Sequence, residues 1–282
     1  MTTLEQLPEA HEIRGPSAYG GGFRRFTSLT WLIAFNEFRL SYFGSLLGYL
    51  WSLMRPLMQF GVLYVIFSRV LHFGKGIPHY SVLLLFNLVL FLFFQDTTQQ
   101  AVRSVVNREL LVRKMQFPRL VIPLSVVVTQ LLNFATNFLA VVIFMLASGV
   151  QPGWKWVLFP LLLVPLTIFT SAVSMALSSL YVPFRDVLPI WGVFATVLFY
   201  ATPVIYPISK VPPGWQKVVL ANPIADILQQ GRRWLFDPGA QGAWQAIGGL
   251  PWALIPIAVF VAVTAFGVWV FNHLAPRIAE RL

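Results

Sequence analysis

The side chains able to do catalytic chemistry are few and scattered in this sequence. Proton transfer and metal binding need paired carboxylates or clusters of histidine, cysteine and acidic residues. The chain has 10 acidic residues with no Asp-x-Asp pair, 4 scattered histidines and no cysteine. It also contains no His-Glu-x-x-His, Gly-x-Ser-x-Gly or Gly-x-x-x-x-Gly-Lys segment. The sequence therefore predicts no catalytic centre and no metal site, and any work driven by a nucleotide would need a partner protein.

Polar side chains inside apolar segments are the other candidates for function. One segment carries a broad polar face, made of Ser125, Thr129, Asn133, Thr136 and Asn137. Amides at membrane depth need partners or water, because an unpaired amide in hydrocarbon is costly. This face is either a wet or sugar-bearing path or a set of hydrogen bonds between helices, and the second interpretation is favoured. The polar end of the preceding segment contains Gln95, Asp96, Gln99 and Gln100. It is either part of the same path or a solvated end at the membrane interface.

The composition shows what surrounds these side chains. Of 282 residues, 57% are apolar and 11% charged, and the mean hydropathy is +0.72. Water-soluble domains carry roughly 25% charged residues, so the solvent around this chain is lipid. We expect an all-α integral membrane protein with six transmembrane helices, over residues 46–70, 80–101, 120–148, 155–181, 187–206 and 250–272.

The charges predict an orientation rather than nucleic-acid binding. The chain has 20 basic residues, of which thirteen fall on one side of the six predicted spans, including those of the connection 103–119. By the positive-inside rule that side is the cytoplasm, and both termini lie there. Residues 1–27 lack the apolar stretch of a signal peptide and are expected to form a cytosolic tail, as are residues 273–282.

A ring stripe precedes the first span. Trp31, Phe35, Phe38 and Tyr42 follow one another at i, i+4, i+7 and i+11, which places all four on one helix face. The spacing predicts an amphipathic helix over 28–45 that lies flat in the headgroup region. The alternative is a simple extension of the first span. In the fourth span, Thr170, Ser174 and Ser178 predict close packing against another helix.

Five short motifs carry a resemblance to a known family. The connection 103–119 and the start of the next span contain Asn107, Leu110-Leu111, Arg113-Lys114, Phe117-Pro118-Arg119 and Pro123-Leu124. Before it stand Gly48, Leu50-Trp51 and Pro56, and after it Phe184-Arg185-Asp186, Thr202-Pro-Val-Ile-Tyr-Pro207 and Asn222-Pro223. In this order and spacing the chain resembles ABC-2 type permeases, in the branch that exports polysaccharide, O-antigen or teichoic acid. Asp96 departs from the family, where a small polar residue is usual.

The resemblance implies a transporter subunit and not an enzyme. Such a permease is a homodimer in the bacterial cytoplasmic membrane, and two copies of a separate ATPase subunit bind ATP and Mg. It exports a lipid-linked glycan of the O-antigen, galactan or teichoic-acid type, and the chain itself holds no cofactor. Within the six-span domain 46–272, the resemblance assigns coupling to the ATPase to Asn107, Glu109, Leu110, Arg113, Lys114, Phe117, Pro118 and Arg119.

The resemblance also implies short re-entrant helices in segment 203–249 that gate the outer end of the pore. The prolines of that segment agree, since they forbid one long helix. The residues expected at this outer gate are Thr202, Pro203, Tyr206, Pro207, Asn222 and Pro223.

A pore for a sugar chain uses aromatic faces, which offer flat apolar surfaces to the C–H groups of a sugar. The candidates to line such a pore are Phe60, Tyr64, Phe67, Trp191, Phe194 and Tyr200, and packing is the competing interpretation for each. A lipid headgroup bearing phosphate needs a cation where it enters. Arg39 and Arg55 are the candidates, with an orienting role as the alternative.

Two other functions compete with glycan export. One is an ABC-2 permease that exports drugs or lipids, and the Phe-Pro-Arg and Thr-Pro-Val-Ile-Tyr-Pro motifs argue against it. The other is a membrane-embedded transferase of sugars or lipids, which would need paired acidic residues that this sequence lacks.

Overall fold

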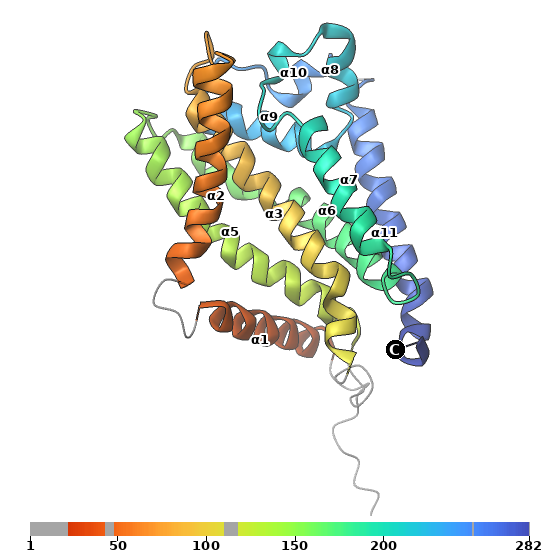
Figure 1. Ribbon diagram of the computed structural model, residues 1–282. Coiled ribbons are helices and arrows are strands. Elements are labelled where there is room, and N and C mark those ends of the chain that lie inside the picture. Colours follow the sequence, from red (N-terminus) through yellow and green to blue (C-terminus); the bar gives the residue numbers. More distant parts are fainter. Residues whose placement is uncertain (1–21, 43–47, 110–117, 250, 282) are drawn as a thin grey trace, which may run out of the picture.

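The computed structural model describes residues 22–42, 48–109, 118–249 and 251–281, and it is all-helical over these ranges. Most helices stand upright and side by side, whereas one lies across their end (Figure 1). The upright helices are α2 (Gly48–Tyr64) with its π-helical extension η1 (Val65–Val70), α3 (Tyr80–Asn107), α5 (Val121–Ala147), α6 (Phe159–Leu180), α7 (Val187–Ala201) and α11 (Leu254–Arg281). The transverse helix is α1 (Gly22–Tyr42).

Five of the upright segments are long and apolar enough to cross a membrane. They are Leu50–Val70, Tyr80–Asn107, Val121–Ala147, Trp154–Leu180 and Leu254–Ala275. The predicted span 187–206 is represented by α7, which is apolar but ends at Ala201. It ends early because Thr202 is extended and precedes Pro203, and a residue before proline avoids the helical region.

The helix α3 forms the centre of the bundle. It packs against α5, α6, α7 and α2, and 78% of its most apolar window is buried. Its run from Val82 to Phe94 is apolar nearly all round, which is the pattern of a helix enclosed by others. The first span differs, because only 6% of the corresponding window of α2 and η1 is buried in this chain.

Small residues allow α6 and α11 to approach closely. Thr170, Ser174 and Ser178 are completely buried in α6, which confirms the close packing predicted for this span. In the facing helix α11, a Cβ atom added to Gly267 would lie 2.3 Å from the backbone oxygen of Ala172 in α6. Only glycine fits at this crossing.

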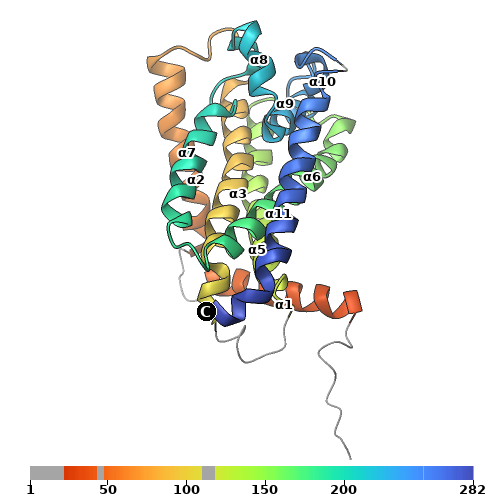
Figure 2. The same ribbon diagram turned by 90° about the vertical axis from the view of Figure 1, so that its right-hand side faces the viewer.

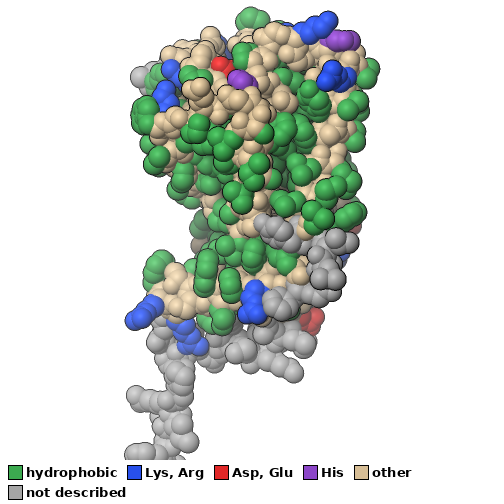
Figure 3. All heavy atoms as spheres, turned by 90° about the vertical axis from the view of Figure 1, so that its left-hand side faces the viewer, with side chains coloured by type: hydrophobic (Ala, Val, Ile, Leu, Met, Phe, Trp, Pro, Cys, Tyr) green, Lys and Arg blue, Asp and Glu red, His purple; other side chains and the backbone are tan. Residues whose placement is uncertain are grey.

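Short helices cover the end opposite α1. They are η3 (Ile208–Lys210), α8 (Pro213–Val219), α9 (Pro223–Leu235) and α10 (Ala243–Ala246), and η2 (Trp154–Leu158) begins the fourth span. Figure 2 shows α8 and α10 at one end of the bundle and α1 at the other, next to the C-terminal end of α11. Exposed hydrophobic side chains cover the face that carries α2, between basic groups near its two ends (Figure 3).

The helix α1 lies transversely, as expected for an interface helix, but its ring stripe is divided. Trp31 and Phe35 are exposed and stack with ring centroids 6.2 Å apart. Phe38 is half-buried and Tyr42 turns toward α5, where its hydroxyl donates to Asn133. Thr30 and Ala34, on the side of the helix that adjoins this stripe, are buried. Residues 43–45 of the predicted interface helix lie outside the described residues.

Candidate functional site

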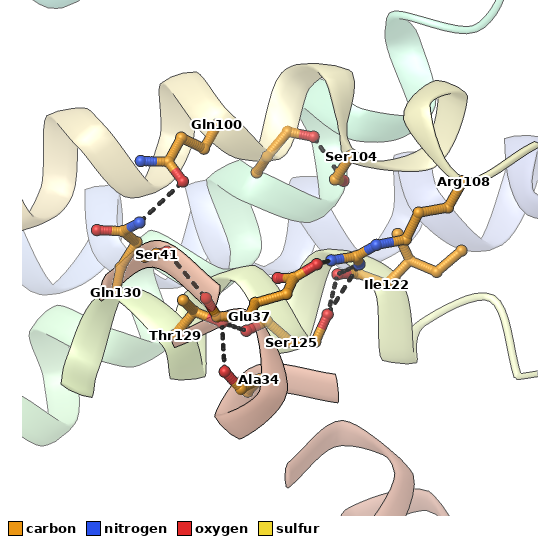
Figure 4. A network of polar contacts seen from close by, with 11 residues as sticks. Ala34, Glu37, Ser41, Gln100, Ser104, Arg108, Ile122, Ser125, Thr129 and Gln130 are labelled. Atoms are coloured by element: carbon orange, nitrogen blue, oxygen red, sulfur yellow. Dashed lines mark hydrogen bonds and ion pairs between the residues drawn. The ribbon is translucent and has the colours of Figure 1, made fainter. Parts of the chain in front are cut away.

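A polar network joins α1, α3 and α5 at the end of the bundle where α1 lies (Figure 4). Its centre is Arg108, which follows α3 and whose side chain is only 14% exposed. The guanidinium donates to the Glu37 carboxylate of α1, to the Ser125 hydroxyl at 3.0 Å and to the Ile122 carbonyl at 3.3 Å. Burial lowers the pKa of Arg108, so these acceptors stabilise a charge that water reaches poorly.

The network continues along α5 toward the membrane interior. The Thr129 hydroxyl donates to the carbonyl of Ser125 at 2.8 Å and lies 3.2 Å from that of Ala34. Further along, the Gln130 amide donates to the Gln100 side chain at 2.8 Å. The polar face of α5 thus binds α1 and α3, which confirms hydrogen bonding between helices for this part of the face.

Two adjoining cavities lie along the same polar residues. The larger has a volume of about 810 Å³ and is lined by α1, α3 and α5, with Leu188 of α7. The smaller, of about 160 Å³, reaches α2 at Arg55 and Pro56. Both are lined by Gln100, Gln130 and Asn133, so they share one polar wall.

At the opposite end, side chains from α3 and α9 hold the segment that follows α7. The Tyr80 hydroxyl donates to the Ile205 carbonyl at 2.9 Å, and the Asn87 amide donates to the carbonyls of Pro203 and Val204 at 3.0 and 3.3 Å. From α9, the Asn222 amide donates to the Thr202 hydroxyl at 2.8 Å.

Asn222 also begins α9. Its side chain accepts a hydrogen bond from the backbone N–H of Ile224, and Pro223 occupies the first turn, which is a typical helix start. Tyr206 lies in the same segment, and its hydroxyl donates to the carbonyls of Tyr200 and Ala201. The expected gate residues therefore converge, with Pro207 immediately before η3.

One carboxyl group of this end has no partner among the described residues. Oδ1 of Asp226 in α9 is buried without a hydrogen bond there. Burial raises the pKa of Asp226 to about 7.

The described residues also contain no group of three or more histidine, aspartate or glutamate side chains placed to hold a metal.

Comparison with known proteins decides the family. The family model described as ABC-2 type transporter matches residues 28–236. The chain belongs to the ABC-2 type transporter family. It is 30% identical over 254 residues to the O-antigen export system permease protein RfbA of Klebsiella pneumoniae, covering 89% of this chain and 93% of that protein. The permease of the same name from Myxococcus xanthus is 33% identical over 195 residues, covering 68% of this chain and 74% of that protein.

Only part of the predicted coupling segment of this ABC-2 transporter is described. Asn107 is exposed at the end of α3, and Glu109 is half-exposed just after it. Pro118 is exposed before α5, and the Arg119 side chain donates to the carbonyl of Ala275 in α11. The remaining four candidates lie outside the described residues: Leu110, Arg113, Lys114 and Phe117.

The six candidate pore residues of this ABC-2 transporter lie in different surroundings. Phe60 stacks on Tyr64 at 5.7 Å and meets Phe144 edge-on at 5.5 Å, and Phe67 meets Phe73 at 6.3 Å. Trp191 donates to the Thr98 hydroxyl at 3.1 Å, so its indole is committed to the contact between α7 and α3.

The remaining two pore candidates are exposed. Phe194 and Tyr200, with exposed fractions of 53% and 61%, present their rings outside the chain.

Of the two arginines expected at a headgroup, Arg39 lies on the exposed side of α1. The side chain of Arg55 is 70% exposed, with its guanidinium 3.7 Å from the Asp96 carboxylate.

The sequence analysis did not predict the Glu37–Arg108 pair or the roles of Tyr80 and Asn87. The signal for Asn87 was present, since it is the one polar side chain within the apolar run from Val82 to Phe94.

Proposed function

We propose that this chain is the membrane permease of an ATP-driven exporter that moves a lipid-linked polysaccharide of the O-antigen kind across the bacterial cytoplasmic membrane. The observation that carries the proposal is the match to an O-antigen export permease over 89% of the chain. The cargo of such a relative is a glycan, and galactan or teichoic-acid chains belong to the same chemical class.

In this proposal α7 is a sixth crossing, and both termini are cytoplasmic. Thirteen of the 20 basic residues lie on the side of α1 and the 103–119 connection, which supports the orientation. The short helices of 203–249 then lie at the outer end and act as re-entrant gate elements.

A second copy of the chain would complete the transporter. The faces of α2 and α7 that are not packed in this chain support a homodimer. On α2, Trp51 and Val62 are 66% and 60% exposed, and on α7 Val193 is 67% exposed. Apolar faces of this kind are typical of surfaces that meet lipid or another subunit.

A separate ATPase subunit, present in two copies with ATP and Mg, would act on α1 and the 103–119 connection. Charge at Glu109 and Arg113 flanks the apolar pair Leu110-Leu111, a pattern suited to a protein contact. Reversing both charges should lower ATP turnover coupled to transport while the dimer stays folded. A solvated loop that serves orientation alone would leave the coupling unchanged.

The aromatic residues and the two arginines have roles in the same proposal. Phe60, Tyr64, Phe67, Trp191, Phe194 and Tyr200 would give weak, repeated contacts along the pore. Arg39 and Arg55 would meet the lipid pyrophosphate on the cytoplasmic side. Arg55→Ala should then let the lipid-linked glycan accumulate inside the cell, and Phe60→Ala with Tyr64→Ala should slow export without abolishing ATPase activity.

The test is ATP turnover by the purified permease–ATPase complex in lipid nanodiscs, with and without a lipid-linked glycan. The proposal expects turnover to rise with a glycan substrate. If every such glycan leaves turnover unchanged while small amphiphiles stimulate it, the chain is an exporter of drugs or lipids instead.

A further inference from the structure

Of the two adjoining cavities between α1, α2, α3 and α5, the larger has the size of a ligand site and the smaller extends it. The larger measures about 810 Å³ and the smaller about 160 Å³, against roughly 300–1,000 Å³ for small-molecule pockets. They lie inside one chain, beside the helices whose exposed faces would meet a second copy. The outer gate does not account for them, and the connection 103–119 lines only one side of the larger cavity, through Asn107 and its neighbours.

Amides are the commonest polar side chains in the wall of these cavities. The larger is lined by Gln99 and Asn107, the smaller by Asn137, and both by Gln100 and Gln130. Each amide offers a carbonyl acceptor and two N–H donors. A sugar hydroxyl also donates and accepts, so a wall of amides is complementary to a polyhydroxylated ligand.

The charges are balanced in the smaller cavity, whereas the larger is lined by two guanidinium groups and one carboxylate. In the larger cavity Arg108 already pairs with Glu37, and in the smaller Arg55 lies 3.7 Å from Asp96. Arg103 also lines the larger cavity, but it is exposed to solvent. A phosphate placed among these groups would meet a carboxylate in either cavity, and like charges repel at such range. The ligand that fits the smaller cavity is therefore uncharged.

Asn137 supplies an acceptor that the described residues leave unused. Its Oδ1 atom is buried and makes no hydrogen bond within them, although it belongs to the wall of the smaller cavity. Buried polar atoms are nearly always paired, so an unpaired one calls for an explanation. Phe93 and Phe134, both buried and with ring centroids 5.4 Å apart, form an apolar part of the same wall.

We propose that these cavities form a saccharide subsite that binds uncharged, hydroxyl-rich sugar units of the transported glycan on the cytoplasmic side. Gln130 and Asn137 hydrogen-bond the hydroxyls, and the buried Phe93 and Phe134 close the apolar side of the smaller cavity. Arg55, at the α2 edge of the smaller cavity, remains available to the lipid phosphate outside it. This inference rests on the proposed function, since it names the part of the glycan that the permease binds.

The decisive variant is Asn137→Leu, assayed as the permease–ATPase complex in nanodiscs. Removing one neutral hydrogen bond to the ligand should raise the lipid-linked glycan concentration for half-maximal ATPase stimulation by about two- to tenfold. The response to undecaprenyl pyrophosphate without sugar should stay as in the wild type. The thermal midpoint should hold or rise, because the substitution removes an unpaired buried carbonyl. A purely structural asparagine would lower the midpoint and leave the glycan response unchanged.

Gln130→Ala is the second variant and Gln241→Ala the control. Gln130→Ala should weaken glycan stimulation in the same range, whereas Gln241 is exposed at the opposite end and its variant should match the wild type. If a glycan stimulates the wild type and Asn137→Leu equally, the saccharide subsite is refuted and the proposed function stands. If no glycan stimulates the wild type, both fail.

A labelling experiment separates a sugar from a phosphate. The chain has no cysteine, so Ser41→Cys places a single thiol at the wall of the larger cavity. A free neutral oligosaccharide should slow modification of this thiol by a maleimide at least threefold, and inorganic pyrophosphate should not. Protection by pyrophosphate alone would make the cavity an anion site and overturn the proposal.

Discussion

Replacing Glu37 by glutamine should destabilise the junction of α1, α3 and α5. The substitution keeps the shape of the side chain but removes the carboxylate that faces Arg108. Breaking a fully buried ion pair costs about 3–5 kcal/mol. Here the Arg108 side chain is 14% exposed but that of Glu37 is 35% exposed, so water screens part of the loss. The hydrogen bonds from Arg108 to Ser125 and Ile122 also remain. We therefore expect a loss of about 2 kcal/mol.

A double-mutant cycle measures this interaction separately from other effects. Glu37→Gln, Arg108→Gln and the double variant are purified, and the free energy of unfolding is measured for each in the same detergent. The double variant should be more stable than the sum of the single losses by about 1–2 kcal/mol, because it leaves no unpaired charge. Hydrogen exchange over residues 22–42 should accelerate in both single variants. Additive losses within about 0.5 kcal/mol would refute the reasoning.

Three further outcomes follow from packing, burial and charge. Gly267→Ala should cost about 1–3 kcal/mol, seen as a lower thermal midpoint, because its Cβ meets a backbone oxygen of α6; Gly61→Ala, with open space around it, should not. Burial raises the pKa of Asp226 from 3.8 to about 7, so the folded state holds a proton that the unfolded chain releases. Stability should therefore fall as pH rises from about 4 to 7, and Asp226→Asn should flatten this dependence. In intact cells an impermeant thiol reagent should label Gln241→Cys and spare Thr27→Cys.

Each of these outcomes has a result that would contradict it. An unchanged midpoint for Gly267→Ala would mean that α6 and α11 can separate at little cost. A pH dependence that persists in Asp226→Asn would assign the titration to another group. Labelling of Thr27→Cys in intact cells would invert the orientation.

Hydropathy predicted the spans because it reports burial in lipid, which is a local property of the chain. It did not predict where α7 ends, although Thr202-Pro203 carried that information, since a residue before proline avoids the helical conformation. Mean hydropathy did not distinguish the enclosed α3 from the exposed α2, because both are apolar. The apolar run around all sides of α3 was the sequence feature that did.

The polar contacts were harder to predict than the spans. Arg108 and Glu37 lie 71 residues apart, and Asn87 reaches a carbonyl 116 residues away. Charge near a span predicts orientation first, so the sequence offered no reason to pair this arginine with α1. Asn133 and Asn137 of α5 were predicted as links between helices, and Asn133 acts so because it accepts a hydrogen bond from the Tyr42 hydroxyl of α1. Asn137 differs because its carbonyl oxygen has no partner among the described residues.

The spans differ in how far the rest of the chain buries them, and this difference predicts which of them can move. The helix α3 is surrounded by α5, α6 and α7, and tilting it would open voids along its whole length, at the cost that close-packed interiors impose. Few residues of the first span are fully buried in its own chain, so tilting it opens fewer voids within that chain. We therefore expect the conformational change that widens a passage to move α2 relative to α3, while α3 keeps its position in the bundle.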